Sequence, residues 1–286
     1  MTSGPLTPTA ELRFLLGTHQ PHWLTDFAVP LFVSDRRLRE RTTLPRAYSE
    51  WALDSGGFTE LSDYGGWETT TPAEYAARVR RYRDEIGSLS WAAPQDWMCE
   101  PAILAGGQVE GRTFVGTKLT VPEHQRRTVE NFLTLRELAP DLPFIPVLQG
   151  WQVSDYLRCA AQYFARGVDL LAAPVVGVGS VCRRQASREA AEIFAVLVDE
   201  YPGIRLHGFG VKAEGLGMYG SLLRSADSMA WSKAALYDAP LPGCAHKSCS
   251  NCPRYAMRWR DQVLTAAAEH ARHPRGIQMS LLFAAA

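Results

Sequence analysis

The sequence predicts an α/β fold, a (β/α)8 barrel of the triosephosphate isomerase type. Short apolar runs alternate with amphipathic segments that carry helix start and stop signals, a pattern typical of parallel strands joined by right-handed helical crossovers. About eight apolar runs occur in the chain, which favours a barrel over an open doubly wound sheet. Polar residues follow several of these runs, as expected at the catalytic edge of a barrel.

The expected strands are short and apolar, and turn residues bound most of them. In chain order they are residues 13–17, 30–34, 51–54, 90–94, 143–149, 170–178, 204–211 and 228–232.

The expected helices lie between these strands. The first has Thr71 as N-cap, Pro72 at its first position, Glu74 at the third and Gly87 at its end. Further helices are expected over residues 120–140, 154–167, 187–203 and 254–263.

Composition is that of an ordinary globular protein. The chain has 286 residues, of which 46% are hydrophobic, and no run approaches the roughly 18 apolar residues of a membrane span. The first residues lack the basic start and apolar stretch of a secretion signal, so we expect a cytoplasmic location without membrane association.

Charge does not exclude a nucleic-acid partner. Thirty basic residues balance thirty acidic ones, but the arginines come in clumps, which suits phosphate binding. The candidates for nucleic-acid contact are Arg183, Arg184, Arg254 and Arg258. The alternative is that these clumps are solvated helix faces.

The strongest local motif is CAHKSCSNCP. Cys244, His246, Cys249 and Cys252 offer three thiolates and an imidazole within nine residues, a complete tetrahedral ligand set for structural Zn²⁺. The alternatives are disulfides, which are disfavoured in a reducing compartment, and unrelated surface cysteines. We therefore expect a catalytic barrel over residues 1–240, followed over residues 241–286 by a zinc-binding loop and a C-terminal helix packed on the barrel.

Several segments together resemble the tRNA-guanine transglycosylase family, from about residue 50 to 253. They are similar in order and approximate spacing to the family's conserved segments: LDSGGF, PQDWM, PVLQGW, VVGVGS, HGFGVK and SADSMAWS. The resemblance implies a zinc-containing (β/α)8 barrel that exchanges guanine for a 7-deazaguanine.

Two departures point to one branch of this family. The histidine lies inside the cysteine cluster, and the segment after Asp227 lacks the Thr-Arg pair typical of the tRNA enzymes. The chain is also short for an added RNA-binding domain. The pattern is most like the DNA-acting deazapurine-DNA transglycosylases, which place 7-cyano-7-deazaguanine (preQ0) into DNA, in some cases with helper proteins.

The resemblance implies roles for the polar residues at the strand ends. Asp227 is expected to be the nucleophile that forms a covalent glycosyl-enzyme, and Asp54 the general acid and base. Contacts with the base are expected from Ser55, Gly56, Gly57, Asp96, Gln149, Gly177, Gly179 and His207. For each of these residues a turn, a helix cap or a core position is the structural alternative.

Two other functions stay open. One is the same exchange on tRNA, and the other is a non-catalytic nucleic-acid-binding partner subunit built on the same barrel. The presence of acids at both Asp54 and Asp227 argues against the second, because a pure binding protein would need neither.

Overall fold

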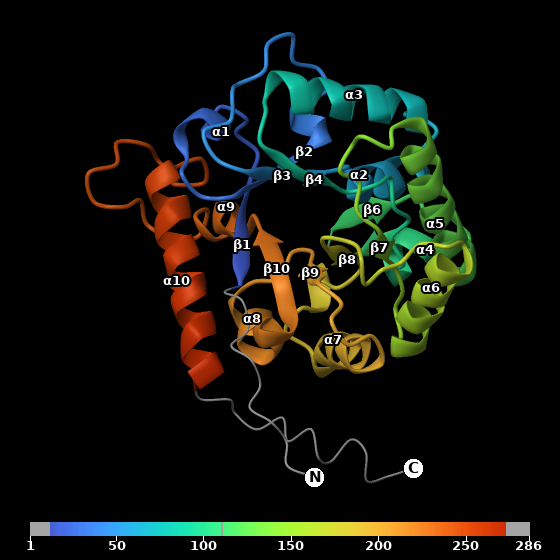
Figure 1. Ribbon diagram of the computed structural model, residues 1–286. Helices are drawn as coiled ribbons and strands as arrows, with labels where there is room; N and C mark the ends of the chain where they lie inside the picture. Colours follow the sequence, from blue (N-terminus) through green and yellow to red (C-terminus); the bar gives the residue numbers. More distant parts are fainter. Residues whose placement is uncertain (1–11, 110, 273–286) are drawn as a thin grey trace.

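The computed structural model describes residues 12–109 and 111–272, and eight parallel strands form a single curled sheet at its centre (Figure 1). The strands are β1 (Arg13–Thr18), β2 (Leu31–Ser34), β3 (Trp51–Asp54), β4 (Leu89–Ala92), β7 (Val147–Leu148), β8 (Val176–Val178), β9 (Leu206–Gly208) and β10 (Leu223–Ser228). Their order is β4-β3-β2-β1-β10-β9-β8-β7, so strands consecutive in the chain are neighbours and the first pairs with the last. The predicted α/β class is confirmed.

The two edge strands of the sheet are bridged at one point. The Ala92 N–H donates to the Pro143 carbonyl at 3.0 Å, and the Ile145 N–H donates to the Ala92 carbonyl at 3.1 Å. A parallel bridge therefore joins Ala92 to Phe144, in the segment that leads into β7. This contact brings the ends of all eight strands around one interior.

Helices lie around the outside of the curl (Figure 1). They are α1 (Trp23–Asp26), α2 (Gly57–Thr59), α3 (Pro72–Glu85), α4 (Pro101–Ala105), α5 (Val121–Leu138), α6 (Val153–Ala165), α7 (Arg188–Glu200), α8 (Ala213–Tyr219), α9 (Ala230–Ala234) and α10 (Pro253–Arg272). The β2–β3 connection holds only a 3-10 turn, η1 (Asp35–Arg37), so the ideal alternation of strand and helix is not complete there.

Capping residues explain where the long helices begin. Thr71 accepts from the Glu74 N–H at 3.3 Å, and the Glu74 carboxylate accepts from the Thr71 N–H at 2.8 Å, which is the predicted capping box. Thr120 and Ser187 accept in the same way at the starts of α5 and α7. The helix predicted from residue 154 begins one residue earlier, at Val153.

Four of the predicted strands are wrong in extent. Residues 170–178 form a strand only over β8, residues 204–211 only over β9, and residues 143–149 only over β7 with the Phe144 bridge. The strand predicted over 228–232 lies over β10 instead, and α9 occupies most of the predicted range. The last error has a physical reason. Strand β10 is buried but rich in small polar residues, so a hydropathy pattern does not identify it as a strand.

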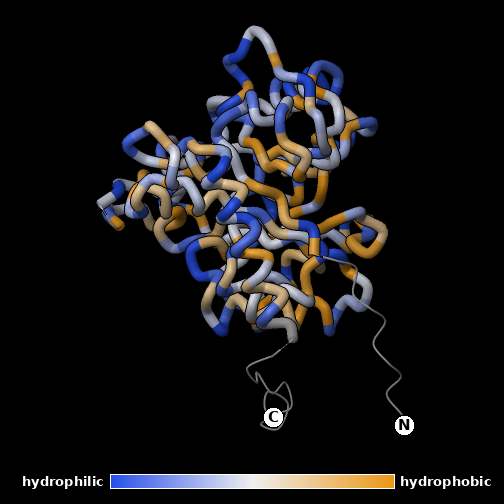
Figure 2. The backbone as a smooth tube through the Cα atoms, turned by 90° about the vertical axis from the view of Figure 1, so that its left-hand side faces the viewer, coloured by the Kyte–Doolittle hydropathy of each residue, from blue (hydrophilic) through white to orange (hydrophobic). Residues whose placement is uncertain are grey.

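Apolar side chains fill both faces of the sheet. Trp51 and Leu53 pack outward against the helices, whereas Ala52 between them points into the curl. The interior cluster consists of Leu15, Ala52, Trp91, Ala93, Ile145, Val147 and Val175. Burial on both faces is why the strands are nearly continuous apolar runs, and Figure 2 shows such apolar segments running through the middle of the molecule.

The C-terminal helix packs against elements near the two ends of the described chain. Helix α10 lies beside α8 and β1 (Figure 1), and it extends well beyond the predicted residues 254–263. Residues 1–11 of the predicted barrel region (1–240) and residues 273–286 of the predicted C-terminal region (241–286) lie outside the described residues. Within the part described, no helix has the length and apolar character needed to cross a membrane.

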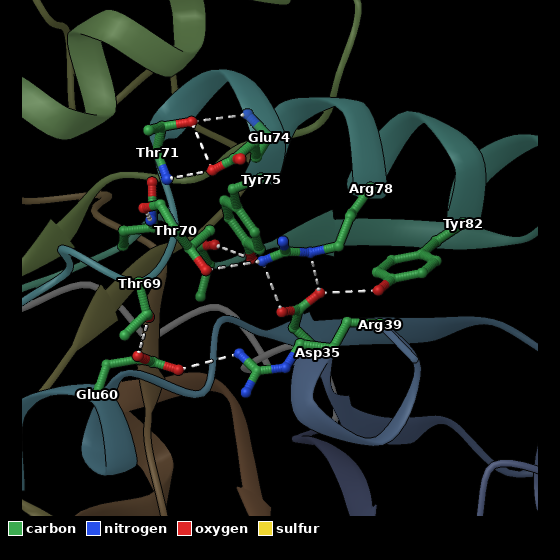
Figure 3. A network of polar contacts seen from close by, with 12 residues as sticks. Asp35, Arg39, Glu60, Thr69, Thr70, Thr71, Glu74, Tyr75, Arg78 and Tyr82 are labelled. Atoms are coloured by element: carbon green, nitrogen blue, oxygen red, sulfur yellow. Dashed lines mark hydrogen bonds and ion pairs between the residues drawn. The ribbon is translucent and has the colours of Figure 1, made fainter. Parts of the chain in front are cut away.

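A buried ionic network holds the loop that follows β3 (Figure 3). Asp35, 1% exposed, accepts from Arg78 at 3.0 and 2.9 Å and from the Tyr82 hydroxyl at 2.8 Å. Beside it, the buried Glu60 accepts from Arg39 at 3.0 Å and from Thr69. Arg78 thereby ties α3 to Asp35 in the segment after β2, and the Arg39–Glu60 pair ties that segment to the loop after β3.

We expect Arg78→Leu to lower the free energy of unfolding by about 3–5 kcal/mol, because it leaves the buried Asp35 carboxylate without its cation. Urea denaturation measures this change. The matched control is Arg83→Leu on the same helix, which removes an exposed ion pair with Asp141 and should change stability by no more than about 1 kcal/mol. Equal effects of the two substitutions would contradict the role given to the network.

Candidate active site

The predicted site residues meet at the carboxyl edge of the sheet. Asp54 is the last residue of β3, and Asp227 is the next to last of β10. Asp96 lies shortly after β4, and Gln149 directly follows β7. Because the sheet is parallel and curled, the side chains that follow these strands face one another around its rim.

The surroundings of Asp54 shift the pKa of its carboxyl. Burial raises the pKa of its carboxyl, the Gly56 N–H and the Ser34 hydroxyl lower it by hydrogen bonding, and the nearby charge of Asp227 raises it again. The net pKa is above the ordinary value. A carboxyl group in this state can give a proton to a leaving group and take one back.

The backbone favours glycine at position 56, and a neighbouring side chain leaves little room for a Cβ at position 57. Gly56 has a φ of +82°, and a Cβ there would lie 2.8 Å from the Arg36 side chain. A Cβ on Gly57 would lie 3.0 Å from the Trp67 ring. Between them and Asp54, Ser55 is 3% exposed, and its buried hydroxyl has no partner among the described residues.

Asp96 and Gln149 form one buried polar unit. Gln149 donates its side-chain amide to an Asp96 carboxyl oxygen, and its amide oxygen accepts from the Ser180 hydroxyl at 2.7 Å. Ser180 in turn accepts from the Cys99 N–H at 2.7 Å. Burial raises the pKa of Asp96 to about 7, against the opposing effect of the Gln149 hydrogen bond.

Gly179 and Gly177 make room for side chains of the protein itself. A Cβ on Gly179 would lie 2.1 Å from the Gln149 amide nitrogen, and one on Gly177 would lie 2.5 Å from the Phe209 ring. Their N–H groups are bonded to the Leu148 and Pro146 carbonyls. The glycines therefore shape the site, and neither N–H is free for a ligand.

Ser180 is a site residue that the sequence did not suggest. It has a φ of +57°, which is uncommon outside glycine, and it is 5% exposed. Within the described chain its N–H has no hydrogen-bond partner. Strained residues of this kind cluster at functional sites, and the only signal in the sequence was the place of Ser180 directly after Gly179.

Asp227 lies in a buried hydrogen-bonded group. Its Oδ1 accepts from the Gly210 N–H at 3.1 Å and lies 3.2 Å from the His207 Nε2. The other ring nitrogen of His207, Nδ1, lies 2.9 Å from the Ser225 hydroxyl. Asp227 is 7% exposed and His207 is fully buried, so the histidine contacts the acid from inside the sheet.

A further buried acid, Glu100, was also missed by the sequence analysis. Glu100 is 8% exposed, and one of its carboxyl oxygens, Oε2, has no partner in the described part of the chain. Burial raises its pKa above the ordinary value, although the charges of Arg183 and Arg184 act in the opposite direction. No sequence pattern indicated Glu100, because it precedes Pro101 as an ordinary helix N-cap would.

The four candidate arginines differ in their surroundings. Arg183 is exposed, with its guanidinium 5.1 Å from the centre of the Phe58 ring. Arg184 is half-buried, lies 4.0 Å from the centre of the Trp151 ring, and donates to the Ser180 carbonyl at 3.2 Å. Arg254 donates to the Pro242 carbonyl at 3.1 Å, and Arg258 is exposed on α10. Only Arg183 combines exposure with a place beside the candidate site.

The four candidate metal ligands converge. The donor atoms of Cys244, His246, Cys249 and Cys252 all lie within 4.8 Å of one another. The sulfurs of Cys244 and Cys252 are 3.9 Å apart, close to the roughly 3.8 Å expected between two thiolates on a tetrahedral zinc ion. The cluster fits a metal ion held by all four residues, with no position left for substrate.

The start of α10 favours a thiolate in this cluster. Burial acts to raise the pKa of Cys252, but the N–H groups of Tyr255 and Arg254 and the contact with Cys244 outweigh it, so the pKa is lowered. Cys252 directly precedes Pro253, the first residue of the helix. The helix end therefore helps to prepare the ligand for a cation.

The site and the fold define an α/β protein with a curled parallel sheet, carboxyl groups at its carboxyl edge and a separate metal-binding loop. The chain matches the model of the DpdA family, described as "DeoxyPurine in DNA protein A", over residues 10–286 and belongs to that family. DpdA is a tRNA-guanine transglycosylase-like family, so the resemblance found in the sequence is confirmed.

Other comparisons add little. A crystal structure of 2,3-dimethylmalate lyase, a member of the PEP mutase/isocitrate lyase superfamily, is similar with a TM-score of 0.40 and 12% sequence identity. The match covers 90% of this chain and 93% of that one. No curated protein matches the sequence.

We expect the purified protein to contain one zinc ion per chain and Cys252→Ser to lose it, because a buried ligand of a closed site is removed. Metal analysis by mass spectrometry measures the content, and thermal unfolding measures the accompanying loss of stability. Cys182→Ser, an exposed cysteine outside the cluster, is the control. Unchanged zinc content in Cys252→Ser would contradict this ligand set.

Proposed function

We propose that this protein exchanges guanine in DNA for a 7-deazaguanine, with 7-cyano-7-deazaguanine (preQ0) as the incoming base. The observation that carries the proposal is the arrangement of Asp54 and Asp227 at one end of the sheet, beside the buried Asp96–Gln149 pair. Membership of the DpdA family supports a transglycosylase-type enzyme acting on DNA. Both acids lie near enough for the charge of one to affect the pKa of the other.

The first half of the reaction breaks the bond between C1′ and N9 of guanine. A carboxylate oxygen of Asp227 attacks C1′, and the electron pair of the broken bond stays with the departing base. Asp54, whose raised pKa lets it hold a proton, donates that proton to guanine. The result is a covalent glycosyl-enzyme on Asp227 and a free guanine.

The second half reverses these steps with another base. The incoming deazaguanine gives its N9 proton to the Asp54 carboxylate, and its N9 then attacks C1′. The bond from C1′ to Asp227 breaks, which regenerates the Asp227 carboxylate. Asp54 ends protonated, as it began, so no further reactant is needed.

Recognition of the base is assigned to the buried polar unit. An ionised Asp96 accepts from both N1–H and the 2-amino group of guanine, a pattern that adenine lacks. The Gln149 amide and the Ser180 hydroxyl lie next in the hydrogen-bonded chain. The Gln149 amide and the Ser180 N–H, which has no partner among the described residues, suit the 6-oxo group. Ser55, with its unpartnered hydroxyl, is a further donor to the base.

The substrate nucleotide must leave the base stack to reach this site. Flipping a base costs a few kcal/mol, and contacts with the flanking phosphates offset that cost. Arg183 is the arginine best placed to make them, because it is exposed and adjoins the rim through Phe58. Zinc held by the cysteine and histidine cluster would stabilise the loop before α10 and take no part in the chemistry.

The decisive test is transfer of labelled guanine into DNA and into tRNA, side by side, by the purified chain. We expect label in DNA, and we expect Asp227→Asn to lower the exchange rate by at least about 10⁴-fold while zinc content and folding are kept. Asp199→Asn, an exposed acid on α7, is the control and should retain full activity.

Three other outcomes would contradict parts of this proposal. Label in tRNA alone would show the alternative enzyme of the same superfamily. Binding of DNA without any exchange, even with helper proteins added, would favour a non-catalytic partner subunit. Full activity in Asp227→Asn would overturn the assignment of the nucleophile.

The ionisation of Asp96 predicts how guanine binding depends on pH. Its folded pKa is about 7 and the ionised form is the acceptor, so affinity should rise with pH. Between pH 6 and pH 8 we expect the dissociation constant of guanine to fall about 10-fold. Calorimetry or equilibrium dialysis measures it. Asp96→Asn should bind weakly at both values, and a flat profile in the unmodified protein would contradict this role.

A further inference from the structure

The interior of the sheet holds two residues, Ser225 and His207, that no reaction step above uses. They form a hydrogen-bonded chain that runs from Ser225 through His207 to Asp227, and all three residues are less than 10% exposed. Ser225 and Asp227 are two residues apart on β10, so their side chains point to the same face. His207 lies opposite on the neighbouring strand, where its backbone is paired with Ser225.

Hydrogen-bond chemistry fixes the tautomer of the ring. A carboxylate can only accept, so the proton facing Asp227 must be carried by Nε2 of the histidine. In a neutral ring Nδ1 is then an acceptor, and the Ser225 hydroxyl, 2.9 Å away, is the donor that it faces. Ser225 thereby selects the tautomer that can donate to the acid.

Aromatic side chains hold the ring in this orientation. The centre of the His207 ring is 4.8 Å from that of Trp91 and 4.7 Å from that of Phe209, both edge-on, and 6.0 Å from that of Phe32. The ring is fully buried among them. It therefore has little freedom to rotate away from Asp227.

Both donors reach the same oxygen of the acid. His207 Nε2 and the Gly210 N–H contact Oδ1 of Asp227, whereas Oδ2 has no hydrogen-bond partner among the described residues. One oxygen is thus anchored from within the sheet and the other is left free at the rim. This is the arrangement that a carboxylate nucleophile needs in order to present one oxygen in a fixed direction.

We propose that His207 is a positioning residue that aligns Asp227 for attack on C1′, with Ser225 setting its tautomer. This inference rests on the proposed function of Asp227 as the nucleophile. His207 acts through the acid and does not itself contact the base, so its loss should slow the chemical step and leave base binding unchanged.

Two conservative substitutions separate positioning from packing. The amide nitrogen of glutamine can take the place of Nε2, whereas the shorter asparagine matches Nδ1 and cannot reach Asp227. We expect His207→Asn to lower kcat of base exchange about 10- to 100-fold, the effect of one hydrogen bond to a charged group, with KM for guanine unchanged. His207→Gln should recover most of the loss. Equal kcat losses in both variants, or a change in KM alone, would overturn the proposal.

A spectroscopic test does not depend on activity. Nitrogen-15 NMR of histidine-labelled protein reports the tautomer, and the His207 signals are assigned by their loss in His207→Asn. We expect the neutral Nε2–H form in the unmodified protein and a mixture of tautomers in Ser225→Ala. A predominant Nδ1–H form would contradict the hydrogen bonds from Ser225 to His207 and from His207 to Asp227, whether or not the protein exchanges bases. The expected tautomer in a protein that exchanges no base would support these hydrogen bonds but contradict the proposed function.

Discussion

Burial of carboxyl groups at the carboxyl edge of a parallel sheet is the constraint on which the site depends. An acid removed from water must be neutralised or hydrogen-bonded, and each acid here meets that demand differently. Asp35 has a bidentate arginine, Asp227 has a histidine and a backbone N–H, and Asp96 has a glutamine together with a raised pKa. Asp54 lies at the same edge of the sheet, and its pKa is also raised. In the function that we propose, these differences in partners and pKa suit Asp35 to a structural role, Asp227 to nucleophilic attack, Asp96 to reading the base and Asp54 to carrying the proton.

Local signals in the sequence predict much of the fold. The capping box of Thr71 and Glu74 and the apolar runs of β1 to β4 are determined by short-range propensity and periodicity, and the structure confirms them. Strand β10 could not be placed, because its polar residues are buried by partners on other strands, as Ser225 is by His207. Such pairing depends on the tertiary fold, which no local window contains.

The candidate site, like the fold, could be predicted from the sequence only in part. Motif order was enough to suggest Asp54, Asp96, Gln149 and Asp227, and the structure places all four at one edge of the sheet. The spacing of the cysteine and histidine cluster likewise predicted a compact group of donors. Ser180, which lies in the same buried hydrogen-bonded group, was missed, because a lone serine next to a glycine is common in any turn. Its importance appears only once the hydrogen-bond partners are known.

The central claim is that guanine binds between Asp96 on one side and Asp54 and Asp227 on the other. A crystal structure of the protein with guanine tests it most directly. The account predicts N1 and the 2-amino group on the Asp96 carboxylate, and N9 directed toward the space between Asp54 and Asp227. Guanine bound instead in the groove of about 600 Å³ at the opposite end of the sheet, lined by Phe14, Arg224 and other residues, would contradict it.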